Sequence, residues 1–222
     1  MHTDMRLARI VSSLIISCPI DKLYMCHPPS INKPPIIVFS GTKDLKEVFR
    51  YDLKIKPKNW PPNNSEAGFV HAGFADRTQL ILGEIQDFVN KYDNFIIGGW
   101  SLGGSCAILS ASALQNEGKQ INSVITFGTP RLASKRFQLF YKKQDLWDKT
   151  INYFTPKDPI VTKIPKLYKN VGHSKLIQYE SENDWSHHDI KVYENCISKE
   201  YSDCVMHYNV LMAKYNDWIK HV

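Results

Sequence analysis

The sequence predicts an α/β fold with a mostly parallel central sheet and helices on both of its faces. Three short runs of β-branched and aromatic residues indicate buried strands, at 35–40, 95–97 and 121–127. Such near-continuous apolar runs are typical of parallel strands that are covered on both faces. Helical stretches alternate with them, which indicates βαβ units. With 222 residues the chain has the size of one such domain, and two small domains are the less favoured alternative.

The composition is that of a packed domain with a modest positive charge. Hydrophobic residues make up 43% of the chain and aromatic residues 12%, which suits a sizeable core and excludes a disordered chain. The net charge is +6, but the basic residues are scattered, and their longest cluster, 54–58, is short. We therefore expect no nucleic-acid partner. A weak attraction to anionic lipid or to an acidic substrate fits this charge better.

The cysteines favour a reducing compartment. There are five of them, an odd number, and no C-x-x-C pair occurs. A disulfide framework is therefore not expected, and reduced thiols are the default interpretation. A bridge between Cys196 and Cys204 stays open as an alternative. We expect a cytoplasmic or otherwise reducing location rather than secretion.

The N-terminal segment predicts a packed amphipathic helix. Its apolar residues recur with the period of one helix face, and they are Leu7, Ile10, Val11, Leu14, Ile15 and Cys18. The alternative is the core of a short signal peptide, but Pro19 and Asp21 follow it in place of a small-residue cleavage site. No run approaches the roughly 18 apolar residues that a membrane span needs. We interpret 1–30 as a helical extension of a single domain that spans 1–222.

The other elements follow from apolar periodicity and turn residues. A Pro-rich connection at 27–35 precedes the first strand, a helical turn or short helix is expected within 43–53, and 56–64 predicts a loop. Helices are expected at 75–92, 102–115 and 133–146. Further strands are expected at 150–154 and 175–179, and helical segments in the tail at 187–197 and 205–220.

One stretch carries the candidate chemistry. The apolar residues 95–97 lead through glycines to Ser101, and good helix formers follow. A strand, a sharp turn with one serine at its tip and a helix are the layout of the nucleophile elbow in G-x-S-x-G hydrolases. Gly99 and Gly103 lack a Cβ, so the limbs of the turn can close and Ser101 can stand clear of the sheet. Because the pentapeptide also occurs by chance in roughly one such chain in ten or fifteen, its strand-to-helix context carries the inference.

A serine nucleophile needs a base, and the base needs an acid that orients it, in the chain order Ser, acid, His. Asp158 comes just after a strand, where an open α/β sheet places its ligands. Its rivals, which lack that position, are Asp145, Asp148 and Asp184. The histidines that follow are His173, His187, His188, His207 and His221. The pair His187–His188 begins a helical segment and is the best placed, with a surface pair as the alternative.

The tetrahedral intermediate of acyl transfer also needs donors for its oxyanion. The backbone N–H of Leu102, directly after the nucleophile, is the first candidate. Gly41 and Thr42, at the end of the strand 35–40, are the second, since glycine permits close approach of the backbone and Thr42 adds a hydroxyl.

Six short motifs together resemble the class 3 lipase family, whose members include fungal triacylglycerol lipases and feruloyl esterases. They cover roughly 33–197 in the family's order: Phe39-Ser-Gly-Thr42, Val70-His-Ala-Gly-Phe74, Gly99-Trp-Ser-Leu-Gly-Gly-Ser105, Thr126-Phe-Gly-Thr-Pro-Arg131, Lys157-Asp-Pro-Ile160, and His188 with Tyr193. Six motifs in order are far more specific than the elbow alone. The resemblance implies an α/β-hydrolase fold.

The resemblance also implies a role for each matching residue. It implies Ser101 as nucleophile, Asp158 as acid and His188 as base. Thr42 and Leu102 would form the oxyanion hole. This chemistry requires no metal and no cofactor.

The chain departs from the family pattern at several points. Trp100 stands where the family has a histidine, and Ser40 stands where it has an arginine. His71, although inside a motif, is expected to be structural. The gap 41–70 holds no helix with the apolar face of a lid, which favours an esterase or phospholipase with an open site.

The expected function is that of a serine carboxylic-ester hydrolase, a lipase or esterase that cleaves acylglycerol or phospholipid-type esters through an acyl-enzyme. An acyltransferase, in which an alcohol replaces water, is the nearest alternative. A catalytically silent hydrolase fold that binds lipid or protein and a non-enzymatic lipid-surface module are the others. The expected partners are a small-molecule or lipid ester, with peripheral contact to a lipid surface and no nucleic acid.

Overall fold

The structure of the chain is a computed structural model, and it describes residues 2–19, 22–26, 33–42, 56–163, 168–199 and 219–221. The strands are β1 (Leu23–Cys26), β2 (Ile36–Phe39), β3 (Pro57–Asn59), β4 (Phe69–His71), β5 (Asn94–Trp100), β6 (Gln120–Phe127), β7 (Thr150–Phe154), β8 (His173–Leu176) and β9 (Ile219–His221). The helices are α1 (His2–Ser17), α3 (Ala72–Glu84), α4 (Gln86–Asn90), α5 (Leu102–Asn116), α6 (Lys135–Lys143), α7 (Pro159–Lys163), the 3₁₀ helix η1 (Asp184–His188) and α8 (Ile190–Lys199).

Within the described residues the main sheet has seven strands, in the order β8-β7-β6-β5-β2-β1-β9. Neighbours from β2 to β8 pair in parallel, whereas β1 pairs antiparallel with both β2 and β9. All four residues of β2 are buried, as expected for a strand covered on both faces. The predicted α/β fold with a mostly parallel sheet is confirmed.

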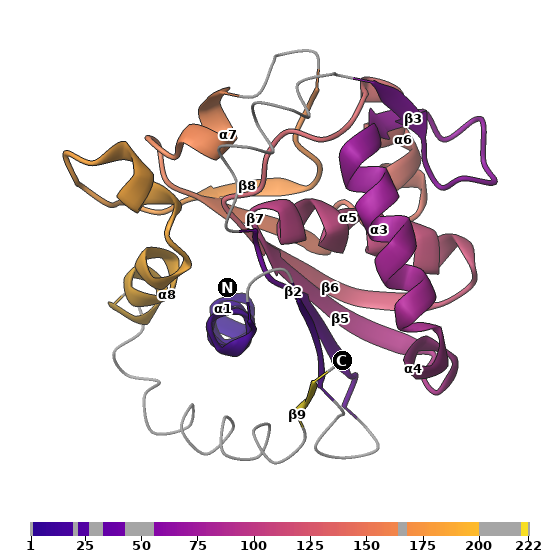
Figure 1. Cartoon of the computed structure of the whole chain (residues 1–222), viewed down its shortest axis with the longest axis horizontal. Coiled ribbons are helices and arrows are strands. Elements are labelled where there is room, and N and C mark those ends of the chain that lie inside the picture. Colours follow the sequence, from indigo (N-terminus) through magenta and orange to yellow (C-terminus); the bar gives the residue numbers. More distant parts are fainter. Residues whose placement is uncertain are drawn as a thin grey trace.

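Helices cover both faces of this sheet (Figure 1). The helices α3, α4, α5 and α6 lie on one face, and α1 and α8 lie side by side on the other. The helix α5 is buried from Gly103 to Leu114 and is built largely from small and aliphatic side chains, so it can lie close to β5 and β6. It also accepts a hydrogen bond from the buried indole of Trp60, whose Nε1 lies 2.9 Å from the Leu109 carbonyl oxygen.

The N-terminal helix packs by the apolar face that its sequence predicts. Val11, Leu14 and Ile15 are almost completely buried against the sheet. Gly98 of β5 allows this approach, because a Cβ there would collide with Cγ1 of Val11. The helix also contacts α8, where the Ser13 hydroxyl donates to Glu194 over 3.3 Å.

Several boundaries differ from the sequence predictions. The extension 1–30 is not only helical, because β1 within it joins the main sheet and buries Leu23 and Met25. The loop predicted at 56–64 contains β3, which pairs with β4. The helix expected at 75–92 divides at Ile85, where the backbone leaves the helical region with φ −101° and ψ 8°.

Two further differences concern the second half of the chain. The strand expected at 175–179 lies earlier, at His173–Leu176, where it pairs with β7. Residues 219 and 220, expected to end the helix 205–220, instead form β9 together with His221 and pair with β1, so tertiary pairing overrides the local helical pattern there. The expected turn at 43–53, the remainder of the helix at 205–220 and Cys204 lie outside the described residues.

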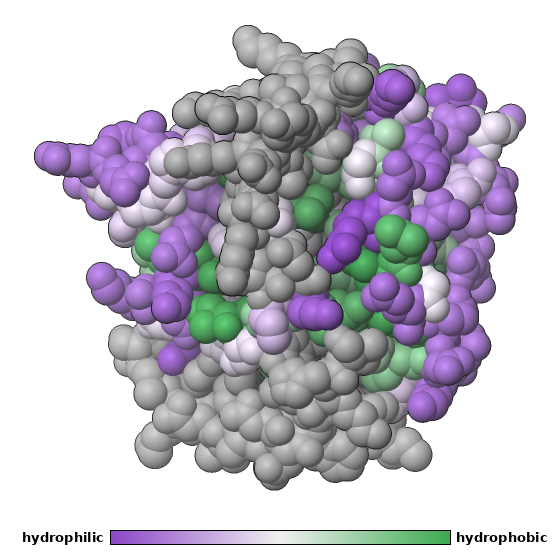
Figure 2. All heavy atoms as spheres, in the orientation of Figure 1, coloured by the Kyte–Doolittle hydropathy of each residue, from purple (hydrophilic) through white to green (hydrophobic). Residues whose placement is uncertain are grey.

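The described residues present a largely polar surface on the face shown in Figure 2. On the face shown in Figure 2, hydrophilic residues predominate along both sides and hydrophobic residues gather toward the centre. Among the described residues, the large hydrophobic side chains that stay exposed are Leu80, Leu139, Leu176 and Trp185. None of the helices in the described ranges has the length and apolar character needed to cross a membrane.

The contact between α1 and β5 can be tested with one added methyl group. We expect Gly98→Ala to lower the free energy of unfolding by about 1–3 kcal/mol, because the new Cβ overpacks Val11. For a domain of this size the thermal midpoint should fall by roughly 2–4 °C per kcal/mol. Gly83→Ala is the matched control, because nothing lies within 4 Å of its Cβ position on α3. It should be neutral or raise the midpoint, and equal shifts in both variants would contradict the packing.

Candidate active site

The carboxyl ends of the five parallel strands meet at one edge of the sheet, which is where open α/β sheets place their sites. Each strand is followed, directly or after a short segment, by a residue of the candidate site: Thr42 after β2, Ser101 after β5, Gly128 after β6, Asp158 after β7 and His188 after β8. Residues far apart in the sequence are brought together in this way.

Ser101 occupies a strained turn between β5 and α5. Its backbone has φ 58° and ψ −125°, a region that costs a non-glycine residue about 1–3 kcal/mol. The close approach of the backbone requires glycine at both flanking positions. A Cβ at Gly99 would collide with the Gly103 carbonyl, and a Cβ at Gly103 would collide with the Phe39 carbonyl. The Ser101 N–H donates to the Phe127 carbonyl oxygen over 2.9 Å, which holds the turn against β6.

Several polar atoms at this edge are buried without a hydrogen-bond partner among the described residues, including Oγ1 of Thr129 and Nδ1 of His187. The two that belong to candidate catalytic residues are the Ser101 hydroxyl oxygen and Nε2 of His188, in side chains that are 0% and 3% exposed. Leaving a buried polar group unpaired costs about 1–3 kcal/mol, so such groups call for an explanation. The two atoms are not hydrogen-bonded to each other, and both are buried from solvent in the described part of the chain.

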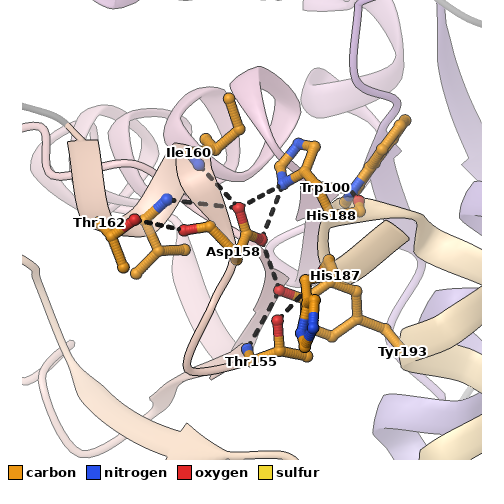
Figure 3. Close-up of polar contacts among 9 residues, drawn as sticks. Trp100, Thr155, Asp158, Ile160, Thr162, His187, His188 and Tyr193 are labelled. Carbon is orange, nitrogen blue, oxygen red and sulfur yellow. Dashed lines mark hydrogen bonds and ion pairs between the residues drawn. The ribbon is translucent and has the colours of Figure 1, made fainter. Parts of the chain in front are cut away.

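Asp158 and His188 form a buried pair (Figure 3). Nδ1 of His188 lies 2.9 Å from Oδ1 and 2.8 Å from Oδ2 of Asp158. Because an ionised carboxylate only accepts hydrogen bonds, Nδ1 carries the proton that it donates here. Nε2 of the neutral ring is therefore a proton acceptor, and this is the nitrogen that lacks a partner.

Three other groups support the Asp158 carboxylate, which is 0% exposed. The N–H of Ile160 donates to Oδ1 over 2.8 Å and that of Val161 over 3.4 Å, both from the first turn of α7. The hydroxyl of Tyr193, on α8, donates to Oδ2 over 2.7 Å (Figure 3). Burial and the neighbouring charge of Asp158 raise the pKa of the Tyr193 hydroxyl well above its ordinary value, so it remains a donor.

The structure separates the two adjacent histidines. The ring of His187 packs edge-on against Tyr179, with centroids 4.8 Å apart, and its carbonyl accepts a hydrogen bond from Thr155. Only His188 of this pair contacts Asp158. His71 packs against the ring of Phe74 at 4.5 Å, as a structural residue would.

The rival acid–histidine pair lies on the surface. His173 contacts Asp148 over 2.8 Å, but the two side chains are 57% and 90% exposed, so water screens them. His207 and the side chain of His221 lie outside the described residues. In the parts of the chain that are described, no three His, Cys, Asp or Glu side chains gather as a metal ion would require.

The candidate oxyanion donors lie beside Ser101. Leu102 is the first residue of α5, and the first N–H groups of a helix have no partner within it and carry partial positive charge. On the other side, a Cβ at Gly41 would lie 3.2 Å from Cβ of Ser101, so only a glycine fits easily there. Thr42 follows it and is 7% exposed.

Two residues that lie within the quoted motifs contribute contacts that their sequence positions did not predict. Gly128 has φ 54°, and a Cβ there would lie 2.8 Å from Oδ2 of Asp158 and 3.0 Å from Nδ1 of His188. The signal in the sequence was a glycine directly after the predicted strand 121–127, at the sheet edge where the expected acid also lies. The motif gives only the spacing of Tyr193 from His188. Because a buried tyrosine hydroxyl needs a partner, a polar contact of Tyr193 was the inference that this spacing allowed.

The geometry of the elbow and the acid–histidine pair agrees with the comparisons to known proteins. A family model described as lipase (class 3) matches residues 36–169, more than half of the chain. The chain belongs to the class 3 lipase family. This membership supports a hydrolase of the lipase type. No curated protein sequence matches the chain significantly.

Solved fungal lipases share the fold. The nonglycosylated LIP2 lipase of Yarrowia lipolytica is 16% identical with a TM-score of 0.60, over 78% of this chain and 77% of that one. A lipase from Rhizopus microsporus var. chinensis is 18% identical with a TM-score of 0.61, over 79% and 72%. The triacylglyceride lipase of Rhizomucor miehei is 19% identical with a TM-score of 0.57, over 78% and 77%. Across such neighbours this chain spans from 48% to 77% of the other chain.

The support that Tyr193 gives to Asp158 can be measured through stability. We expect Tyr193→Phe to lower the free energy of unfolding near neutral pH by about 1.5–3 kcal/mol, because a buried carboxylate loses a donor. The folded-state pKa of Tyr193 is raised above its ordinary 10.0, so its stabilisation is complete below that pH and is lost as the pH rises further.

The difference between wild type and Tyr193→Phe in urea unfolding should therefore narrow above a pH of about 10. A difference that stays constant from neutral to alkaline pH would contradict the proton that the structure assigns to this hydroxyl.

Proposed function

We propose that this class 3 lipase hydrolyses carboxylic esters with Ser101 as nucleophile, His188 as general base and Asp158 as the acid that orients the base. One observation carries the proposal. Asp158 holds Nδ1 of a buried imidazole whose Nε2 has no partner among the described residues, at the sheet edge where a strained turn presents a buried serine hydroxyl. That set of groups is the one that serine acyl transfer requires.

The first half of the reaction forms an acyl-enzyme. Nε2 of His188 accepts the Ser101 proton as the serine oxygen bonds to the ester carbonyl carbon. The carbonyl π electrons move to oxygen, and Leu102 and Thr42 are the proposed donors to that oxyanion. Asp158 stabilises the imidazolium by charge and keeps the ring in the productive tautomer. When the intermediate collapses, the imidazolium gives its proton to the departing alcohol.

The second half restores the enzyme. Water takes the place of the alcohol, His188 accepts one of its protons, and the water oxygen attacks the acyl carbon. Collapse of the second tetrahedral intermediate breaks the bond to the Ser101 oxygen, which takes the proton back from His188. A carboxylic acid leaves, and no redox change or external co-reactant beyond water is involved.

We propose lipid-like esters, of the acylglycerol or phospholipid type, as the substrates. Family membership supports a lipid ester, and one structural neighbour is named a triacylglyceride lipase. The net charge of +6 would favour an anionic lipid surface over a cationic one. Comparing hydrolysis of glyceride and phospholipid dispersions, with and without anionic lipid, would resolve the head-group preference.

The nucleophile can be tested with two serines of equal burial. We expect Ser101→Ala to lower kcat for p-nitrophenyl butyrate and p-nitrophenyl palmitate by a factor on the order of 10⁴ or more. Ser105→Ala is the matched control, since Ser105, in the first turns of α5, is also 0% exposed and its hydroxyl has no partner among the described residues. It should keep kcat within a few-fold.

Equal activity of wild type and Ser101→Ala would overturn the nucleophile assignment. Absence of turnover in the folded wild type, on short and long esters alike, would favour a binding protein with a hydrolase fold. The base is tested in the same assay, because His188→Asn should lose activity on the scale of Ser101→Ala while His187→Asn, which leaves the contact with Asp158 intact, should lose far less.

A further inference from the structure

Trp100, next to Ser101, joins two loops that the proposed reaction needs together. Its indole Nε1–H donates to the backbone carbonyl of His188 over 2.9 Å. Its ring also lies beside the His188 imidazole, with centroids 5.3 Å apart and planes 31° from parallel (Figure 3). The same residue therefore contacts both the backbone and the side chain of the proposed base.

On another side, the indole rests against Gly41. A Cβ placed on Gly41 would lie 2.6 Å from Cε3 and 2.7 Å from Cζ3 of the Trp100 ring, so the six-membered ring packs directly on the backbone of that residue. Gly41 precedes Thr42, a proposed oxyanion donor. The indole thus lies between the end of β2 and the segment that carries His188.

The position of His188 explains why such a contact matters. It is the last residue of η1, a single short 3₁₀ helix, and one residue, Asp189, separates it from α8. Asp158 holds one nitrogen of the His188 ring. This hydrogen bond does not prevent the ring from rotating about it, and it does not restrain the backbone of His188. The hydrogen bond from Trp100 restrains the backbone, and the adjacent indole restricts the ring and keeps water from that side.

We propose that Trp100 is a positioning residue that holds the His188 segment against the Gly41–Thr42 loop, so that base and oxyanion donors keep a fixed separation. The kinetic part of this inference rests on the proposed function. The class 3 lipase pattern has a histidine at this position. A histidine ring is smaller than an indole, so these contacts depend on the tryptophan that this chain has there. Small displacements of a base are costly in rate because proton transfer needs hydrogen-bond distance.

The contact itself can be tested without any substrate. The indole Nε1–H of a tryptophan gives its own cross-peak in the NMR spectrum of nitrogen-labelled protein, and the adjacent His188 ring should displace the cross-peak of Trp100. The spectrum of Trp100→Phe assigns this cross-peak, because it is the one that is lost. The cross-peak of Trp147, whose ring lies 6.2 Å from that of His173, is a reference that should stay in place.

We expect the Trp100 cross-peak to move when His188→Asn removes the imidazole, because the two rings are adjacent. The ring of His187 packs against Tyr179 instead. His187→Asn should therefore leave the Trp100 cross-peak close to its wild-type position. A cross-peak that does not move in His188→Asn, or that moves equally in His187→Asn, would overturn the contact.

Kinetics then separate positioning from mere packing. Trp100→Phe keeps a ring on Gly41 but loses the indole N–H, and we expect kcat for p-nitrophenyl butyrate to fall about tenfold with KM within twofold. Trp100→Ala loses both contacts and should fall further. Trp60→Phe is the matched control, because the indole of Trp60 donates to a backbone carbonyl over the same 2.9 Å away from His188. It should lose stability and keep kcat.

The outcomes distinguish the two proposals. A Trp100 cross-peak that responds to His188→Asn in a protein without ester turnover would refute the proposed function and leave the contact standing. An active enzyme in which Trp100→Phe and Trp60→Phe have equal kcat would refute the positioning role and leave the hydrolase standing.

Discussion

The buried hydrogen bond between Asp158 and His188 is the interaction on which the rest of the structure depends. A carboxylate with no exposed surface is strongly unfavourable unless several donors surround it. Those donors come from three separate elements: the first turn of α7, the ring of His188 at the end of η1, and the hydroxyl of Tyr193 on α8. The pair therefore ties the ends of β7 and β8 to the helix that packs beside α1. Gly128 is required at the end of β6 because any side chain there would occupy the space of this pair.

A second constraint is the strained backbone of Ser101. Its positive φ persists because both limbs of the turn are fixed: β5 pairs on both sides in the sheet, and α5 is buried in the core almost throughout. The small residues of α5 serve this arrangement, since they bring the helix close to the sheet and so set the position of its first N–H groups. The packing of α5 against the sheet therefore both stabilises the core and fixes the position of the candidate nucleophile.

The fold class and the candidate catalytic residues could be predicted from the sequence, because they depend on strong local patterns and on motif spacing. The strand β2 and the helix α5 carry strong local patterns, and their existence and type followed from them. The short strands β3 and β9 did not, because three-residue pairings depend on a partner from elsewhere in the chain. In the site, motif spacing selected Ser101, Asp158 and His188 as candidates. The contacts of Trp100, Gly128 and Tyr193 arise only when loops from different strand ends fold together, and no local pattern encodes them.

In the proposed reaction the hydroxyl of Ser101 attacks acyl-type electrophiles with the help of the His188–Asp158 pair. Labelling with an alkyl p-nitrophenyl phosphonate, followed by peptide mass spectrometry, tests this most directly. We expect one adduct per chain, located on Ser101, with loss of ester hydrolysis in proportion to labelling and much slower labelling when His188 is replaced by Asn. An adduct on another residue, or full ester hydrolysis in a protein already labelled at Ser101, would contradict the account.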